Sequence, residues 1–263
     1  MKYHSIEIEA RDAVRIVRLN DPVRLNAVGP RMVEEVSHAV GSLASSVRAV
    51  IITGNGRAFC SGAALDEESV SANVAQSDRD FGAILETHIN PLMSKLRGLP
   101  VPWISAVRGA AAGVGASLAL AADLVVASES AYFLQAFTRI GLVPDGGASH
   151  LLVKAIGRVR AMELMLLSDR LPAAKALEWG LINRLVTDGQ LEDEAMRLAT
   201  QLARGPSVAL GLARQLVWKA IDEDWITNLK SEREAQRAAG RSCDAEEGIS
   251  AFIQKRPAVF TGS

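Results

Sequence analysis

The chain has 263 residues, with 29 Lys or Arg against 30 Asp or Glu, so its formal net charge is −1. A nearly neutral chain argues against broad electrostatic binding to nucleic acid or to acidic membranes. The length fits one large domain, or a domain with a small appendage, and a hydrophobic content of 49% excludes wholesale disorder. Two cysteines cannot build a disulfide framework, so a reduced setting is expected.

Neither a targeting segment nor a membrane span is expected. The start of the chain, Met1 to Asp12, is rich in charged residues and has no apolar stretch of the kind found in signal peptides. The longest uncharged apolar run lies between Arg108 and Asp123. It holds only 14 residues, which is too short to span a bilayer, and it contains several glycines. We therefore expect a cytoplasmic protein.

The first half of the chain alternates between predicted strands and helices. β-Branched residues at every second position predict a strand hairpin that turns near residues 10–12. Apolar residues at helical spacing predict helices from Pro30 and at about residues 77–97, with a polar loop at residues 61–80 between them. A Gly-rich turn and a small-residue helix through Ala122 are expected after the second of the buried strands. Those strands are predicted at residues 47–53, 101–107, 124–127 and 131–134.

The second half, from Gly146 onward, is predicted to be mostly helical, with breaks at glycines and prolines. Strand–helix alternation followed by helices favours an α/β fold with parallel strands. The Gly205-Pro206 pair is the predicted boundary between a core, residues 1–205, and a C-terminal helical subdomain, residues 206–263.

Two places join a buried strand to a turn of small residues, residues 56–65 and residues 109–116. Bare N–H groups at such turns attract partly negative oxygen atoms, so two turns that face one point would form an oxyanion hole for a thioester carbonyl. The competing interpretation is close packing of a helix on a sheet, which composition alone favours. A dinucleotide site is disfavoured because Leu118 stands where the third Gly of G-x-G-x-x-G belongs. The four histidines show no metal-ligand spacing.

Asp145 stands between an apolar run and two glycines, before an apolar helix. The pattern alone favours a helix N-cap, which is the commonest use of Asp at such a position. The alternative is a carboxylate held against apolar walls, with its pKa raised toward neutrality so that it can move protons.

Taken together, these stretches resemble the enoyl-CoA hydratase/isomerase (crotonase) superfamily along essentially the whole chain. Within it, the chain is similar to the isomerases of the phenylacetate pathway, which convert an aryl-epoxide CoA thioester into an oxepin. The segments that carry the resemblance are residues 20–27, 59–63, 106–123, 141–147, 247–252 and 255–257.

The resemblance implies a crotonase-like spiral of ββα units with C-terminal helical trimerisation elements, assembled as a homotrimer or a hexamer of paired trimers. It implies an acyl-CoA thioester as substrate, with coenzyme A as part of the substrate and no further cofactor. The implied oxyanion-hole donors are the backbone N–H groups of Ala63 and Val114. The implied substrate contacts come from Arg24, from Ser61, Ala63, Ala64 and Leu65, from Phe137, and from Phe260 reaching the CoA of a neighbouring subunit.

The departures from the family pattern indicate the reaction. Hydratases of the family use two glutamates, and Ser117 and Phe137 stand at those positions here. Asp145 matches the acid that family isomerases use to shuttle one proton. We therefore expect an isomerase with Asp145 as acid and base. The alternatives are a hydratase-type lyase with an acid from elsewhere, such as Glu86 or Asp66, and a non-catalytic acyl-CoA-binding relative.

Overall fold

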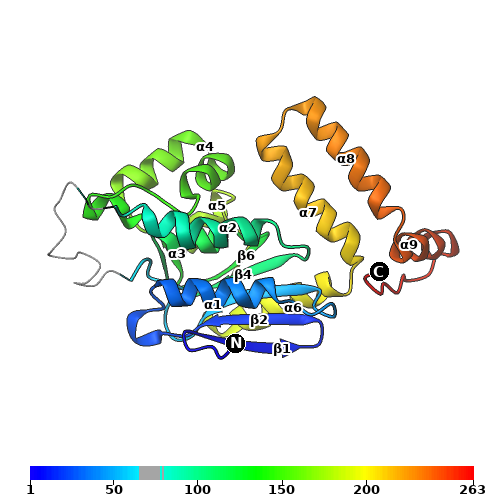
Figure 1. Ribbon diagram of the computed structural model, residues 1–263, viewed down its shortest axis with the longest axis horizontal. Helices are drawn as coiled ribbons and strands as arrows, with labels where there is room; N and C mark the ends of the chain where they lie inside the picture. Colours follow the sequence, from blue (N-terminus) through cyan, green and yellow to red (C-terminus); the bar gives the residue numbers. More distant parts are fainter. Residues whose placement is uncertain (65–77, 79) are drawn as a thin grey trace.

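The computed structural model describes residues 1–64, 78 and 80–263, and a six-stranded sheet forms its centre (Figure 1). The strand order is β1-β2-β3-β4-β6-β9. The strands are β1 (Ile6–Arg11), β2 (Val14–Leu19), β3 (Ala49–Gly54), β4 (Trp103–Val107), β6 (Leu124–Ser128) and β9 (Arg184–Val186).

The predicted hairpin and parallel sheet are both confirmed. β1 and β2 pair antiparallel in a register that joins Arg11 to Val14, and Asp12 turns the chain with a positive φ of 51°. From β2 onward every neighbouring pair of this sheet is parallel. β3 and β4 are buried over nearly their whole length, as their β-branched and apolar residues predict for strands covered on both faces.

A second, smaller sheet was not predicted. It consists of β5 (Ala110–Ala112), β7 (Tyr132–Leu134) and β8 (Leu171–Pro172). The sequence predicts a turn where β5 lies and a helical region where β8 lies, and β9 was not predicted either. Strands of two or three residues, such as the three alanines of β5, carry no period-two signal of their own, so the neighbouring strand decides their pairing.

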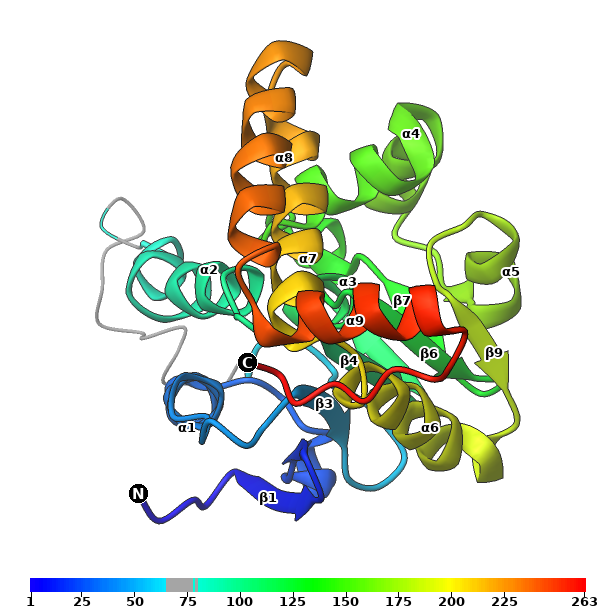
Figure 2. The ribbon, with the colours of Figure 1, turned by 90° about the vertical axis from the view of Figure 1, so that its right-hand side faces the viewer.

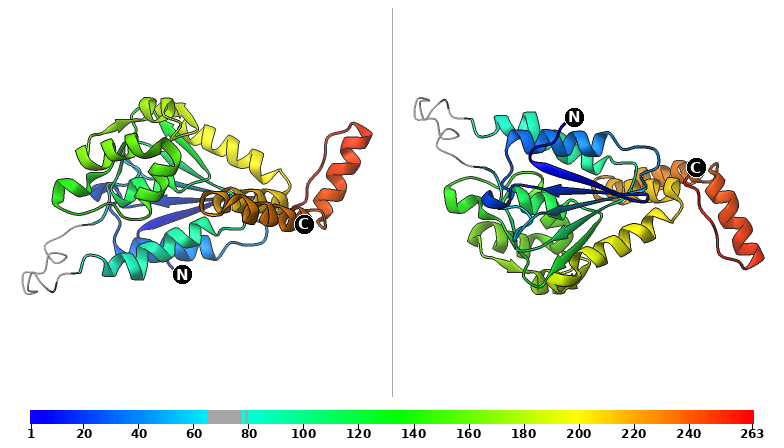
Figure 3. Two further views of the ribbon diagram at one scale, coloured as in Figure 1. Left: turned by 90° about the horizontal axis from the view of Figure 1, so that it is seen from above. Right: turned by 90° about the horizontal axis from the view of Figure 1, so that it is seen from below.

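Helices cover both faces of the main sheet (Figure 3). α1 (Pro30–Gly41), the π-helical turn η3 (Leu85–Ile89) and α2 (Asn90–Arg97) lie on one face, and α6 (Leu191–Ala203) packs on the other against β3, β4 and β6. The helix expected from residue 77 begins later. Asp80 accepts a hydrogen bond from the N–H of Gly82 through its side chain (2.7 Å), and this turn precedes the helix.

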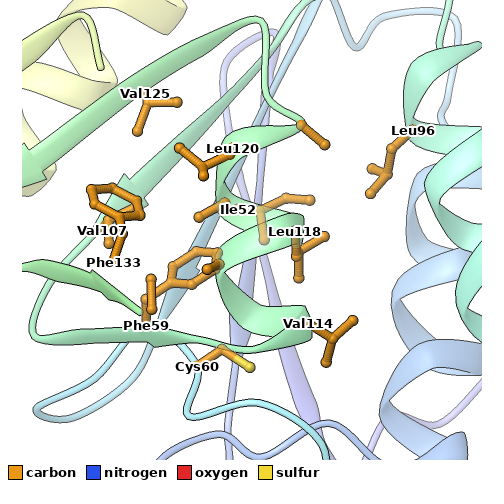
Figure 4. Close-up of a cluster of buried hydrophobic side chains, with 14 of the residues drawn as sticks. Ile52, Phe59, Cys60, Leu96, Val107, Val114, Leu118, Leu120, Val125 and Phe133 are labelled. Atoms are coloured by element: carbon orange, nitrogen blue, oxygen red, sulfur yellow. The ribbon is translucent and has the colours of Figure 1, made fainter. Parts of the chain in front are cut away.

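The small-residue helix α3 (Val114–Leu120) is buried in the larger core (Figure 4). Val114 and Leu118 lie in this core with Phe59, Val107 and Phe133. Ala and Gly at the other positions of α3 let strands and helices approach it closely. The N-terminal turn of α3 thereby receives a fixed place beside β5 and the residues that follow β3.

Two further helices lie between β7 and β9 in the chain, and three follow α6. They are α4 (Ala148–Leu167), α5 (Ala173–Glu178), α7 (Ser207–Asp222), α8 (Trp225–Ala239) and α9 (Cys243–Gln254). α4 bends at Gly157, whose φ is 77°. α7 and α8 lie side by side and extend away from the sheet (Figures 1 and 2). The chain passes from α6 to α7 at residues 204–206, and the division at residue 205 stays a prediction. In the described parts of the chain, no helix is long and apolar enough to cross a membrane.

Candidate active site

The first small-residue turn is held by backbone bonds on both sides of Ala63. The N–H of Val28 donates to Gly62 O (2.7 Å), and the N–H of Ala64 donates to Val28 O (2.9 Å). Gly62 has a φ of 108°, and a Cβ there would lie 3.0 Å from Ala112 O. The N–H of Ala63 donates to none of the described residues, so it is free to bind a ligand oxygen.

The second turn forms the start of α3. Gly113 is the N-cap residue with a φ of 51°, and its N–H donates to Leu134 O (2.8 Å). Val114 is the first helical residue, so its N–H has no intrahelical acceptor, and it donates to no described residue elsewhere. A Cβ on Gly113 would lie 3.7 Å from the Cα of Gly62, so the two turns are in contact. The structure thus brings together the two turns that the sequence singled out.

The backbone of Cys60 connects the two turns. Its N–H donates to Ala110 O and its C=O accepts from Ala112 N, both at 2.9 Å. A Cβ on Gly115 would lie 2.6 Å from both the carbonyl oxygen and the sulfur of Cys60, so glycine is required there. Burial raises the pKa of the Cys60 thiol to about 12, and the thiol therefore stays protonated at neutral pH. Cys60 is a packing residue and not a nucleophile.

Asp145 lies in the loop between the 3-10 turn η4 (Ala136–Ile140) and α4. The N-cap residue of α4 is Gly147, and no side chain caps the helix, so the N-cap interpretation of Asp145 is wrong. The carboxyl group is half-buried, and its Oδ1 is buried without a hydrogen bond from any described residue. Burial raises the pKa of Asp145 to about 6. Asp145 therefore has the properties of the second interpretation, a carboxyl able to exchange a proton near neutral pH.

The loop that carries Asp145 lies directly on the first turns of α3. Ser117 Oγ donates to Asp145 O (2.9 Å), and a Cβ on Gly146 would lie 3.3 Å from Val114 Cγ2. Phe137 is buried beside the same turn, with its Cζ 3.7 Å from the Cβ position of Gly113. Asp145 and Phe137 thus both lie next to the residues that present the free N–H of Val114.

A cavity of about 640 Å³ opens beside Ala63 and Ala64. Its walls include the start of α1 and four charged side chains, those of Arg24, Arg31, Asp21 and Asp80. The Arg24 side chain is 65% exposed, so its guanidinium remains accessible to an anion although it pairs with Asp21 (2.7 Å). Ser61 does not face this cavity: its hydroxyl donates to the backbone oxygen of Arg24 (3.1 Å) and so holds the segment that carries Arg24.

Sequence reasoning missed Arg31. The signal that could have found it is the Pro-Arg pair at the start of a helix, where N–H groups and a cation together favour anions.

Four further candidates from the sequence remain to be placed. Leu65 and Asp66 are outside the described residues. Glu86 is exposed on η3, which favours an ordinary surface role. Phe260 lies near Gly248 of α9, and its carbonyl accepts from Arg48 (3.2 Å), just before β3. Because Ala63 follows the opposite end of β3, Phe260 does not join the other residues within one subunit. Its contact with a neighbour's CoA stays a prediction.

Comparison with known proteins identifies the family and the fold. A model of the enoyl-CoA hydratase/isomerase family matches residues 9–263. The chain belongs to this family. The crystal structure of an enoyl-CoA hydratase subunit from Geobacillus kaustophilus HTA426 covers 100% of both chains, with a TM-score of 0.91 and 34% identity. The predicted family and the predicted crotonase-like fold are confirmed.

Individual relatives have different printed activities. A 1,2-epoxyphenylacetyl-CoA isomerase from Escherichia coli (strain K12) is 42% identical over 95% of each chain. A probable enoyl-CoA hydratase from Rhodobacter capsulatus is 38% identical over 100% of each chain. The chain is thus similar both to an isomerase and to a protein named as a hydratase. The similarity alone does not distinguish between these two reactions, so the residues of the site have to be considered.

Proposed function

We propose that this protein isomerises enoyl-CoA or aryl-epoxide acyl-CoA thioesters, with Asp145 as the acid and base. The observation that carries the proposal is the half-buried carboxyl of Asp145, with a pKa of about 6, lying beside the turn that presents the Val114 N–H. A carboxyl group with a pKa near the working pH can both accept and return a proton, because neither proton transfer is strongly uphill in free energy.

The reaction for an enoyl substrate needs one proton and no water. The ionised carboxylate removes a proton from one carbon of the acyl chain, and the electron pair moves onto the thioester oxygen as an enolate. The N–H groups of Ala63 and Val114 stabilise that oxygen, which is the largest expected contribution to the rate. Asp145 then returns the proton two carbons away, so the double bond shifts and the atoms balance.

Hydration is disfavoured by the side chains around the same turn. Adding water requires a base that activates the water and an acid that protonates the α-carbon. Ser117 and Phe137 cannot serve in these roles, and Ser117 Oγ is already engaged with Asp145 O. The similarity to an epoxyphenylacetyl-CoA isomerase supports isomerisation, and it makes an aryl-epoxide thioester one of the substrates to test.

The cavity beside Ala63 is proposed to bind the CoA part of the substrate. Arg24 and Arg31 offer cationic groups to phosphate oxygens, and Ala63, whose N–H is free, lines the same cavity. We further propose that the protein assembles as a homotrimer or as a hexamer of paired trimers and works in the cytoplasm.

The test is incubation of the protein with 2-enoyl-, 3-enoyl- and aryl-epoxide CoA thioesters in deuterated water, followed by mass spectrometry. We expect deuterium uptake with a shifted double bond, or a rearranged aryl ring, and no added water. Asp145→Asn should lower turnover by roughly 10³-fold or more, because the variant cannot accept a proton. Glu86→Gln is the matched control and should leave turnover unchanged.

Other outcomes would contradict the proposal. A product that carries added water would indicate a hydratase, and loss of that activity in Glu86→Gln would identify its acid. Tight binding of every thioester without any product would indicate a non-catalytic acyl-CoA-binding protein.

A further inference from the structure

Ser117 connects the Asp145 loop to α3. The side chain is fully buried, and its hydroxyl donates to Asp145 O at 2.9 Å, whereas Gly113 O lies at the longer distance of 3.5 Å. The first contact joins two segments that are 28 residues apart in the chain. It fixes the main chain of Asp145 on the same helical turn that presents the Val114 N–H.

The loop also packs tightly against Ser117. Gly146 is buried with a φ of 57°, and a Cβ at this position would lie 3.0 Å from Ser117 Cβ. A larger residue in place of either Ser117 or Gly146 would therefore push the loop away from α3. The small serine lets the loop approach closely, and its hydroxyl holds the loop there.

The carboxyl group of Asp145 depends on this backbone anchoring. Its Oδ1 has no hydrogen-bond partner among the described residues, so no side-chain bond to this atom orients it. The carbonyl of Asp145 accepts two bonds, from Ser117 Oγ (2.9 Å) and from the N–H of Ala148 (3.0 Å). The second bond is local to the loop, whereas the first connects the loop to α3.

We infer that Ser117 is a positioning residue for the isomerisation, one that sets the place of the Asp145 carboxylate relative to the thioester oxygen bound at Val114. The inference rests on the proposed function. The physical reason is that proton transfer requires reacting atoms about 3 Å apart, so displacement of a base by about 1 Å costs on the order of 10²-fold in rate. The thioester itself is held by other groups, so its binding should not depend on Ser117.

The test compares Ser117→Ala with Ser105→Ala. Ser105 is an equally buried serine whose hydroxyl donates to a carbonyl of the same helix, Ala119 O (2.7 Å), away from Asp145. We expect Ser117→Ala to lower kcat about tenfold or more, with KM within about twofold of the wild type. Ser105→Ala should keep kcat within about twofold. Equal effects of the two substitutions on kcat, large or small, would overturn the inference.

A second pair of variants tests the same contact from the loop side. Gly146→Ala and Gly147→Ala both place a side chain at a positive φ, 57° and 84°, but a Cβ at Gly147 meets nothing within 4 Å. Gly146→Ala should therefore lower kcat at least about fivefold more than Gly147→Ala. Equal losses would mean that backbone strain alone matters and would also overturn the inference.

The proposed function is tested separately by Asp145→Asn. If Asp145→Asn is inactive while Ser117→Ala behaves like Ser105→Ala, only the positioning role fails. If Asp145→Asn remains active, the proposed function fails, and the positioning role fails with it.

Discussion

At the scale of single residues, the proposed role of Asp145 predicts how the activity responds to pH. Burial raises its pKa from 3.8 to about 6. The base must be ionised to remove a proton, so kcat/KM should be halved near pH 6 and should fall about tenfold for each further unit of acidification. A pH–rate profile between pH 4.5 and 8 measures this. An acid limb centred near pH 4 would contradict the assignment of Asp145.

The same carboxyl should also affect stability, with a defined sign. Because the folded-state pKa is raised, the stabilisation that protonated Asp145 provides is complete below about pH 4 and is lost as the pH rises through about 6. Asp145→Asn should therefore gain stability relative to the wild type on going from pH 5 to pH 7.5, by on the order of 1 kcal/mol after allowance for solvent screening. Urea unfolding at the two pH values measures the difference.

At the scale of elements, one buried cation holds α7 against the core. The Arg214 side chain is 5% exposed and pairs with Asp123, whose side chain is 14% exposed, at 2.8 Å. The same guanidinium donates to the carbonyls of Leu96, Arg97 and Leu99, which follow or end α2. One side chain therefore joins α7 to the end of α2 and to the segment between α3 and β6.

Removing this cation should be costly. Arg214→Met leaves Asp123 as a poorly solvated charge and leaves carbonyl groups without donors, so we expect a loss of about 3–5 kcal/mol in the free energy of unfolding. Urea titration measures it. The control is Arg197→Met, which removes a solvent-screened surface pair with Glu194 (2.7 Å) and should cost far less stability. Similar losses in the two variants would contradict a special role for Arg214.

At the scale of the whole molecule, large apolar side chains remain uncovered on the C-terminal helices. They are Trp225, Ile226 and Leu229 on α8, and Ile249, Phe252 and Ile253 on α9. Helices that expose apolar residues in one region of a chain are typical of an interface. Exposed apolar side chains on both helices support assembly of several copies through α8 and α9, which lie at the edge of the molecule (Figures 1 and 2).

Mass measurement in solution tests the assembly. We expect about 84 or 168 kDa by light scattering, three or six times the 28.0 kDa of one chain. Phe252→Asp places a charge on a side chain that is 85% exposed in one subunit, and it should shift the mass toward one chain. Val23→Asp, at a side chain that is 92% exposed and far from α9 in the sequence, is the control and should leave the mass unchanged. A wild-type mass of about 28 kDa would contradict assembly.

Local signals explain the parts of the fold that were predictable. The β1–β2 hairpin, α1 and the buried strands β3, β4 and β6 follow from the spacing of apolar residues and from turn residues, both of which act within a few positions. The short strands β5, β8 and β9 were not predictable, because two or three residues pair only when a partner strand is already beside them. The helical segment that leads into α2 begins after the turn at Asp80 and not at residue 77 as predicted. This turn depends on a side-chain hydrogen bond of Asp80, which the spacing of apolar residues does not reveal.

By itself, the sequence determined the family, the alternation of strands and helices, the two small-residue turns and the choice of Asp145 as a candidate acid. Only the tertiary structure decided that Asp145 is a half-buried carboxyl and not a helix cap, that Arg31 lines the cavity, and that Ser117 bonds the Asp145 loop. The physical reason is range. Periodicity and turn chemistry act between neighbours in the chain, whereas desolvation, cavities and the contact of residues 117 and 145 exist only once distant segments have packed together.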